Sequence, residues 1–191
     1  MKRWHGLVAA LMAATLAGGC GTPADPLNMR LAPGDALQLR GFMPEALRGQ
    51  IALGEIAGGA ETWRYWGSQV SAKALDQTLE EALRSVGVLA PLPAGARYQL
   101  SAKLSALQQP DLKWQPQALV SNNRVLATID YTLKDKASGA VLYQRSIRSA
   151  HTAELTEALL FPPERLRLAN EGALRQSLNL LLRDFAELRL P

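Results

Sequence analysis

Two stretches in which apolar and polar residues alternate constrain the fold of this chain more than any other feature. In residues 97–107 the apolar side chains fall on every second position: Tyr98, Leu100, Ala102, Leu104 and Ala106. Residues 123–134 repeat the pattern, with Leu126 as the one apolar residue on the polar side. Successive side chains of a strand point to opposite faces, so both stretches predict strands with one buried and one wet face.

The flanking residues predict the other strands. A strand begins at Val141, because the stretch KDKASG before it has the composition of a turn and ends in glycine. Two strands joined by so short a loop are antiparallel neighbours. We expect a buried strand within residues 50–59, a short edge strand at Leu37–Arg40, and a projecting loop over the proline-containing residues 108–123.

Two amphipathic helices complete the predicted elements. Apolar residues recur every three or four positions in residues 67–86, and Gly87 follows where a helix usually ends. The second helix opens at Pro162 and keeps its apolar stripe to Leu188. Two helices on one face of a mainly antiparallel sheet bury both sets of apolar side chains. The predicted fold is therefore α+β, a two-layer sandwich.

The first twenty residues have the layout of an export signal. Lys2 and Arg3 precede an uncharged apolar run, Gly6–Leu16, which is too short to span a bilayer. The residues that follow, up to Cys20, resemble a bacterial lipobox, although Ala17 stands where leucine is commoner. Cys20 is the only cysteine of the chain, and lipidation explains both its place and its solitude. The alternative is a plain secretory signal, cut near Gly18 or Gly19, that leaves an incidental thiol.

Composition bounds what the mature chain can be. Removal of residues 1–19 from the 191 leaves 172, which suits one domain with a single core. Residues 20–36 contain three prolines and predict a flexible tether, with residues 37–191 as one periplasmic domain. The net charge of +4 falls to +2 with loss of Lys2 and Arg3, and no basic run indicates nucleic-acid binding. Gly21, rather than aspartate, after the cysteine resembles signals sorted to the outer membrane.

Three stretches together resemble a family of uncharacterised proteobacterial periplasmic lipoproteins: residues 51–90, the hairpin 124–147 and residues 164–182. More distantly, the order of elements is similar to small envelope lipoproteins with a TolB-N-like or curli-secretion-lipoprotein-like domain, including the penicillin-binding-protein activator. The resemblance implies a protein that binds partner proteins in the periplasm. Some relatives carry a UDP-N-acetylglucosamine acyltransferase label, which we do not expect as an activity because hexapeptide repeats are absent from the sequence.

The residue counts leave little for catalysis or metal binding. The mature chain has one histidine, His151, and no free thiol once Cys20 is acylated, so a zinc site of the usual His/Cys type is excluded. His151, which we expect just beyond the third strand, could be a general base or merely an exposed or locally bonded imidazole. No G-x-S-x-G stretch supplies a nucleophile. We therefore expect no cofactor, no metal and no catalytic residue.

Aromatic residues beside an arginine are the candidates for partner binding. They lie before the first helix and in the proline-rich loop: Trp63, Arg64, Tyr65, Trp66 and Trp114. Such residues dominate protein interfaces, but the same rings could plug the end of the core. A further set of charged residues is expected to be solvated only: Glu154, Glu157, Arg165, Arg167 and Arg175.

The sequence thus predicts a non-enzymatic outer-membrane lipoprotein that faces the periplasm, is anchored through palmitate or a similar acyl chain on Cys20, and binds an unknown envelope protein. One alternative is an accessory lipoprotein of a lipid or solute transport system, with an apolar ligand between sheet and helices. Another is an enzyme that uses His151. A continuous apolar cavity favours the carrier, a filled core with exposed tryptophans favours the binding module, and a cleft joining His151 to a carboxylate favours the enzyme.

Overall fold

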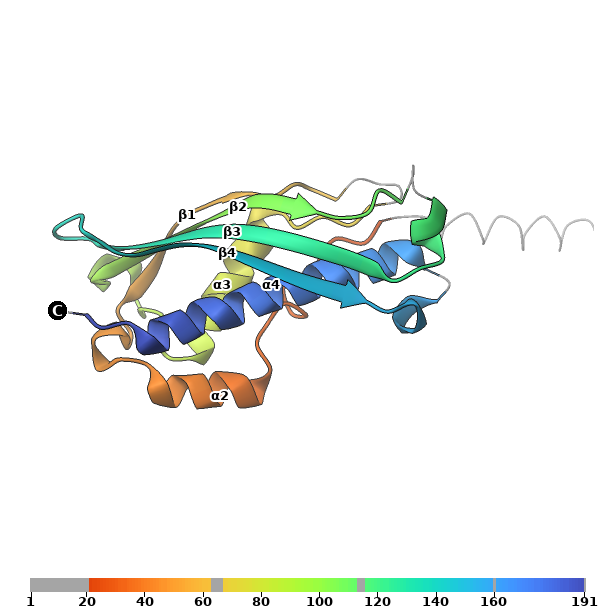
Figure 1. Ribbon diagram of the computed structural model, residues 1–191. Helices are drawn as coiled ribbons and strands as arrows, with labels where there is room; N and C mark the ends of the chain where they lie inside the picture. Colours follow the sequence, from red (N-terminus) through yellow and green to blue (C-terminus); the bar gives the residue numbers. More distant parts are fainter. Residues whose placement is uncertain (1–20, 63–66, 113–115, 160, 191) are drawn as a thin grey trace, which may run out of the picture.

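The computed structural model describes residues 21–62, 67–112, 116–159 and 161–190. These residues form a mixed four-stranded sheet and three α-helices (Figure 1). The helices are α2 (Pro33–Phe42), α3 (Ala72–Ser85) and α4 (Pro162–Glu187). The strands are β1 (Ile51–Gly58), β2 (Tyr98–Gln108), β3 (Asn123–Asp135) and β4 (Val141–Ala153). Short 3-10 helices join them: η2 (Glu45–Leu47), η3 (Pro93–Gly95), η4 (Pro116–Leu119) and η5 (Leu155–Ala158).

The strands lie in the order β1-β2-β3-β4. β1 and β2 are parallel, with α3 between them in the chain, whereas the β2–β3 and β3–β4 pairs are antiparallel. The predicted hairpin is confirmed, and Gly139 in its turn has a φ of 72°, which favours glycine. The sheet is mixed, so the prediction of a mainly antiparallel sheet holds for two of its three pairings.

The helices form two layers rather than one. α3 packs on β1, and α4 packs on β3 and β4, so both cover the same face of the sheet (Figure 1). α2 contacts α3 and α4 on the side away from the sheet. The α+β class is confirmed, but α2 adds a third, partial layer. The edge strand predicted at Leu37–Arg40 was wrong, because these residues lie inside α2.

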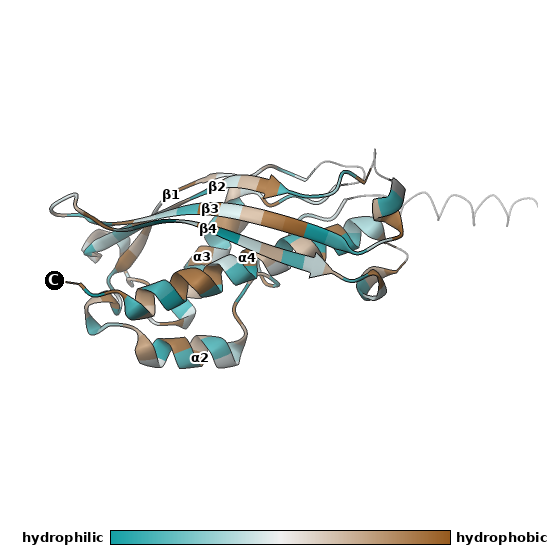
Figure 2. Cartoon of the chain, in the orientation of Figure 1, coloured by the Kyte–Doolittle hydropathy of each residue, from teal (hydrophilic) through white to brown (hydrophobic). Residues whose placement is uncertain are grey.

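Apolar side chains of β3 and α4 fill the space between the sheet and the helices. The inward side chains of β3 are fully buried, as the alternation predicts: Val125, Ala127, Ile129, Tyr131 and Leu133. Figure 2 shows that both β3 and α4 carry hydrophobic as well as hydrophilic residues. The Tyr131 hydroxyl lies 3.1 Å from the hydroxyl of Ser177 on α4, and burial raises the pKa of Tyr131.

β2 departs from its predicted alternation near its end. A β-bulge lies between Leu104 and Ala106, after which Ala106 pairs with Thr128 and Leu107 pairs with Ala127. Leu107 therefore packs against the core, and Ala106 faces the side of the sheet away from the helices. One inserted residue reverses the faces of the residues that follow it, which corrects the prediction that Ala106 points inward.

The segment predicted as a flexible tether, residues 20–36, packs against the domain in its described part. Met29 is fully buried, and Ala24 and Leu31 are nearly so. The Ala24 N–H donates to the carbonyl of Gln69 (3.2 Å). Prolines in this segment prevent a regular strand but do not prevent its apolar side chains from packing. The core therefore begins at Ala24 rather than at Leu37.

Asp135 organises the turn between β3 and β4. Its carboxylate accepts hydrogen bonds from the N–H groups of Ala137 (2.9 Å) and Ser138 (3.0 Å) and from Nε of Arg97 (3.2 Å). The Ser138 N–H, followed by Arg97, holds the pKa of Asp135 below its ordinary value. A carboxyl group with a lowered pKa in the folded state stabilises the fold above its unfolded pKa, and that contribution is lost as the pH falls through the folded value.

We therefore expect Asp135→Asn to lower the free energy of unfolding at neutral pH and to flatten its decline below about pH 4. Urea denaturation of both proteins over a pH series measures this difference. Asp130→Asn, on the sheet face away from the helices, is the control. Parallel pH profiles for wild type and Asp135→Asn would contradict the assignment.

Candidate functional site

The residues predicted to act directly lie outside the described part of the chain: Cys20, Trp63, Arg64, Tyr65, Trp66 and Trp114. Their described neighbours show how the segments around them are held. The Thr62 hydroxyl accepts a hydrogen bond from the Gln69 N–H (2.9 Å), which closes the base of the loop from 62 to 69. Both predictions for these aromatic residues, partner binding and packing at the end of the core, stay predictions.

The first described segment, residues 21–31, runs along α4. The Asp25 N–H donates to Oε1 of Glu171 (2.8 Å), and the carbonyl of Asn28 accepts from Nε of Arg175 (3.1 Å), one turn further on. The segment therefore runs parallel to α4, and Gly21 lies toward the N-terminal end of that helix. Figure 1 shows this segment running to the end of the molecule that carries η4.

Arg165, in the first turn of α4, is fully buried. Its Nη1 donates to the carbonyls of Ala158 (2.5 Å) and Leu159 (3.3 Å), and its Nη2 donates to those of Leu119 (2.5 Å) and Ala118 (3.4 Å). No carboxylate pairs with it among the described residues. Burial lowers the pKa of Arg165. The guanidinium therefore clamps η4 to η5, and the prediction that Arg165 is only solvated was wrong.

Arg167 lies between two carboxylates on the same helix. Its side chain is 13% exposed and forms ion pairs with Glu164 and with Oε1 of Glu171 (2.5 Å). Its hydrogen bond lowers the pKa of Glu164, whereas burial raises the pKa of Glu171. The prediction of simple solvation was wrong here too, although the i, i+3 and i, i+4 spacing was a signal for such pairs. Glu154, Glu157 and Arg175 are exposed, as predicted, but they also make local contacts: Arg175 donates to the carbonyl of Asn28, and the two glutamates cap η5.

His151 lies within β4 rather than beyond it, paired with Val125 of β3. Its half-buried ring packs directly on Gly172 of α4, where a Cβ would overlap it. No ion pair joins His151 to a carboxylate anywhere in the described residues. In the same part of the chain, no three His, Cys, Asp or Glu side chains are placed to hold a metal ion. The geometry gives His151 a packing role between sheet and helix.

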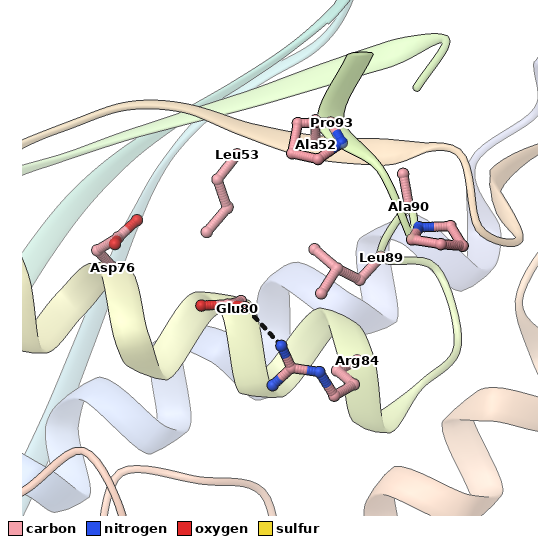
Figure 3. Close-up of a pocket in the computed structure, with 9 residues that line it drawn as sticks. Ala52, Leu53, Asp76, Glu80, Arg84, Leu89, Ala90 and Pro93 are labelled. Atoms are coloured by element: carbon pink, nitrogen blue, oxygen red, sulfur yellow. Dashed lines mark hydrogen bonds and ion pairs between the residues drawn. The ribbon is translucent and has the colours of Figure 1, made fainter. Parts of the chain in front are cut away.

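A groove of about 510 Å³ opens between β1 and α3 (Figure 3). Asp76, Glu80 and Arg84 line it from α3, four residues apart and therefore on one side of the helix. The facing wall is apolar and comprises Ala52, Leu53, Leu89, Ala90, Pro91 and Pro93. Figure 3 shows Leu53 reaching down from β1 toward this row of charged side chains.

The edge of β1 is open beyond Ile51 because the segment that pairs with it, residues 88–90, ends there. The Ile51 N–H donates to the carbonyl of Val88 (2.9 Å), and the Ala90 N–H donates to the carbonyl of Ile51 (2.8 Å). The next donor of this ladder would be the N–H of Leu92, but Leu92 lies between Pro91 and Pro93, and the chain turns there into η3. Main-chain groups two residues apart face the same edge, so those of Leu53 lie at this open edge without a hydrogen bond to any other described residue.

The charges in the groove are unequally paired. Arg84 forms ion pairs with Glu80 and with Glu81 (3.0 Å). Asp76 has no ion-pair partner among the residues described, and partial burial, followed by the charge of Glu80, raises its pKa. The groove thus offers an unpaired carboxylate, an apolar wall and free main-chain groups. Sequence reasoning missed it, although the prolines after the apolar residues 88–90 were a signal of an interrupted strand.

Two further surface cavities, of about 420 and 330 Å³, border α2. Both contain arginine side chains as well as apolar ones, as does the groove beside β1. None of these three is the continuous apolar cavity between sheet and helices that an apolar-ligand carrier needs. No helix among the described residues has the length and apolar content to cross a bilayer.

Comparison with known proteins gives a fold and no family. No family model matches the sequence, and no curated protein matches it. A Xanthomonas campestris protein of the family DUF330 shares 14% identity over 73% of this chain and 87% of its own, with a TM-score of 0.51. A hypothetical protein from Chlamydia trachomatis has 11% identity over 71% of this chain and 96% of its own, with a TM-score of 0.46. A minor lipoprotein from Acinetobacter baumannii has 12% identity over 74% and 94%, with a TM-score of 0.43.

At these identities only the fold is shared, and of these three proteins the Xanthomonas protein alone has a TM-score above 0.5. The likeness to TolB-N-like and curli-secretion-lipoprotein-like domains stays a prediction. The comparisons therefore establish that this arrangement of sheet and helices recurs in a bacterial protein of unknown function.

Proposed function

We propose that this chain is a lipid-anchored binding module of the bacterial envelope, without catalytic chemistry of its own. Acylated Cys20 holds it at the outer membrane, and the folded domain faces the periplasm. The groove between β1 and α3 receives an extended segment of a partner protein. The open edge of β1 at Leu53, beside the unpaired carboxylate of Asp76, carries this proposal.

A strand edge next to an apolar groove supports peptide binding by strand addition. An incoming segment continues the line of residues 88–90 and pairs with the main-chain groups of Leu53. Its alternate side chains lie against Leu89 and the two prolines, since successive side chains of a strand point to opposite faces. A lysine or arginine of the segment meets Asp76. The preferred ligand is therefore an extended peptide with alternating apolar residues and one basic residue.

Selection from a phage-displayed library of seven-residue peptides tests this ligand chemistry, with the mature chain as the immobilised target. We expect enriched peptides to alternate apolar residues and to contain one lysine or arginine. For the best of them, Asp76→Lys is expected to weaken binding about tenfold by fluorescence anisotropy, because it replaces attraction with repulsion. Methylation of the peptide amide that faces Leu53 is expected to weaken binding as well, since it removes a main-chain donor.

Asp130→Lys is the matched control, because it makes the same charge reversal on the sheet face away from the helices. It is expected to leave peptide binding unchanged. Enriched peptides without this pattern, or an affinity that Asp76→Lys and amide methylation do not alter, would overturn the peptide-binding role.

The anchor is tested separately from the groove. Mass spectrometry of the native protein is expected to find an amino terminus at Cys20 that carries a diacylglyceryl group and a further acyl chain such as palmitate. Two or more chains attach a protein stably, whereas one chain binds only marginally. A cut near Gly18 or Gly19 with a free thiol would overturn the anchor and leave the groove to its own test.

A further inference from the structure

Three large apolar side chains are exposed where η4 and η5 meet the start of α4. Val120 is 74% exposed, Leu159 59% and Phe161 56%. We call them the apolar tip. The guanidinium of Arg165 brings their main chain together, since it binds the carbonyls of Leu119 and Leu159. The Phe161 N–H donates to the carbonyl of Ala158 (3.2 Å), which joins the third residue to the same clamp.

The start of the described chain lies at the same end of the molecule. The contacts of Asn28 with Arg175 and of Asp25 with Glu171 direct Gly21 toward the first turns of α4. Figure 1 shows this segment and η4 at one end. Cys20 directly precedes Gly21 in the sequence. Acyl chains on Cys20 therefore bring a bilayer to this end.

We infer that the apolar tip inserts into the lipid surface and holds the domain upright on the membrane. This inference rests on the proposed lipid anchor. The anchor alone fixes one point and leaves the domain free to rotate, whereas a second apolar contact at the same end defines its orientation. With the tip in the bilayer, the helical layer and the groove beside β1 extend into the periplasm.

The tip binds lipid through its apolar side chains rather than through charge. The exposed charged residues of η5 and the residue before it, beside Leu159, are acidic: Glu154 and Glu157. A basic patch would favour anionic lipid, but carboxylates do not. The expected surface is therefore a zwitterionic one, such as phosphatidylethanolamine, and added phosphatidylglycerol is not expected to strengthen the contact.

The lone cysteine makes a direct experiment possible. Lipid on Cys20 leaves Leu159→Cys as the single free thiol of the full lipidated protein, and an environment-sensitive fluorophore can be attached to it. In phosphatidylethanolamine vesicles we expect its emission to shift to shorter wavelength and to be quenched by lipids with brominated acyl chains. The matched control is the same label on Leu37→Cys of α2, which is 72% exposed and is expected to show neither effect.

Removal of the other tip side chains tests the apolar mechanism. Val120→Ser with Phe161→Ser is expected to weaken insertion of the Leu159 label about tenfold, because two exposed apolar side chains no longer enter the lipid. The same change at the exposed Leu27 and Phe42, near α2, is the control and is expected to leave quenching unchanged.

Mass spectrometry of Cys20 in the same preparation separates the possible failures. Acylated Cys20 without quenching at position 159 overturns the apolar tip and leaves the anchor standing. Equal quenching at positions 159 and 37 also overturns it, because the domain then lies on the membrane without orientation. Unmodified Cys20 overturns the anchor, and because its thiol would then take the label too, quenching is measured again with Leu159→Cys in a Cys20→Ser background. Quenching there supports the tip, and its loss overturns both. Sedimentation that shows self-association through Leu159, without quenching, assigns the tip to a second copy and overturns the inference.

Discussion

Arg165→Met is expected to lower the free energy of unfolding by about 3 kcal/mol, which is the largest stability effect we expect of a charged residue in this protein. Methionine keeps much of the buried stem but cannot donate to the carbonyls of residues 118–119 and 158–159. Hydrogen bonds from charged donors contribute about 1.5–3 kcal/mol each, and the abandoned carbonyls regain only part of this from water. Urea denaturation of both proteins measures the loss.

Arg165→Met also removes the cost of burying an unpaired guanidinium, and this effect alone would raise the free energy of unfolding. Replacing a buried charge by an apolar side chain can stabilise a protein when the remaining polar groups are satisfied. Here four carbonyls lose their common donor, and two of them lie only 2.5 Å from it. We therefore expect the loss to dominate. Hydrogen exchange is expected to quicken at the N–H groups of Val120 and Phe161, whose turns the guanidinium holds together.

Two variants bracket this interpretation. Arg165→Lys keeps the charge but not the planar fork, so it is expected to fall between wild type and methionine. Arg175→Met removes an exposed arginine that also binds a carbonyl, that of Asn28, and is expected to change stability by less than about 0.5 kcal/mol. Equal stability of Arg165→Met and wild type, with unchanged exchange, would show that the clamp is not needed.

The long, regular elements could be predicted because one local period describes each of them. Every second residue from Val125 to Leu133 is apolar, with Leu126 as the one apolar residue on the other face, and all the inward residues of β3 are buried. The elements that differ from the prediction do so for local reasons that the spacing of apolar residues does not reveal. The bulge after Leu104 adds one residue to β2, and Leu37 and Leu39 alternate although they lie in a helix. A stretch of four residues fits either period.

The environment of the charged residues could not be predicted, because it depends on segments far apart in the chain. Arg165 binds the carbonyls of η4, 46 and 47 residues before it, and Glu171 binds the main-chain N–H of Asp25, 146 residues away. On the sequence these side chains resemble the exposed polar side of an amphipathic helix. The groove beside β1 has the same origin, since Asp76 and Leu53 are brought together by the packing of α3 on β1.

Gly172→Ala is expected to destabilise the protein by about 2 kcal/mol, although alanine is the better helix former by about 1 kcal/mol. A Cβ on residue 172 would overlap Cγ, Cδ2 and Nε2 of His151, so the ring or the helix must move. The ring has little room, because His151 pairs within the sheet and is half-buried under α4. Thermal and urea denaturation measure the change.

His151→Ala tests whether the overlap with the His151 ring causes this destabilisation. In its background a Cβ at position 172 meets no ring, so Gly172→Ala is expected to stabilise the protein by up to about 1 kcal/mol, in line with helix propensity. The reversal of sign gives a coupling between the two positions of about 2–3 kcal/mol, which a double-mutant cycle measures. Gly172→Ala with the same destabilisation in both backgrounds would mean that another contact sets the spacing of α4 and β4. In that case the packing role of His151 would lose its support.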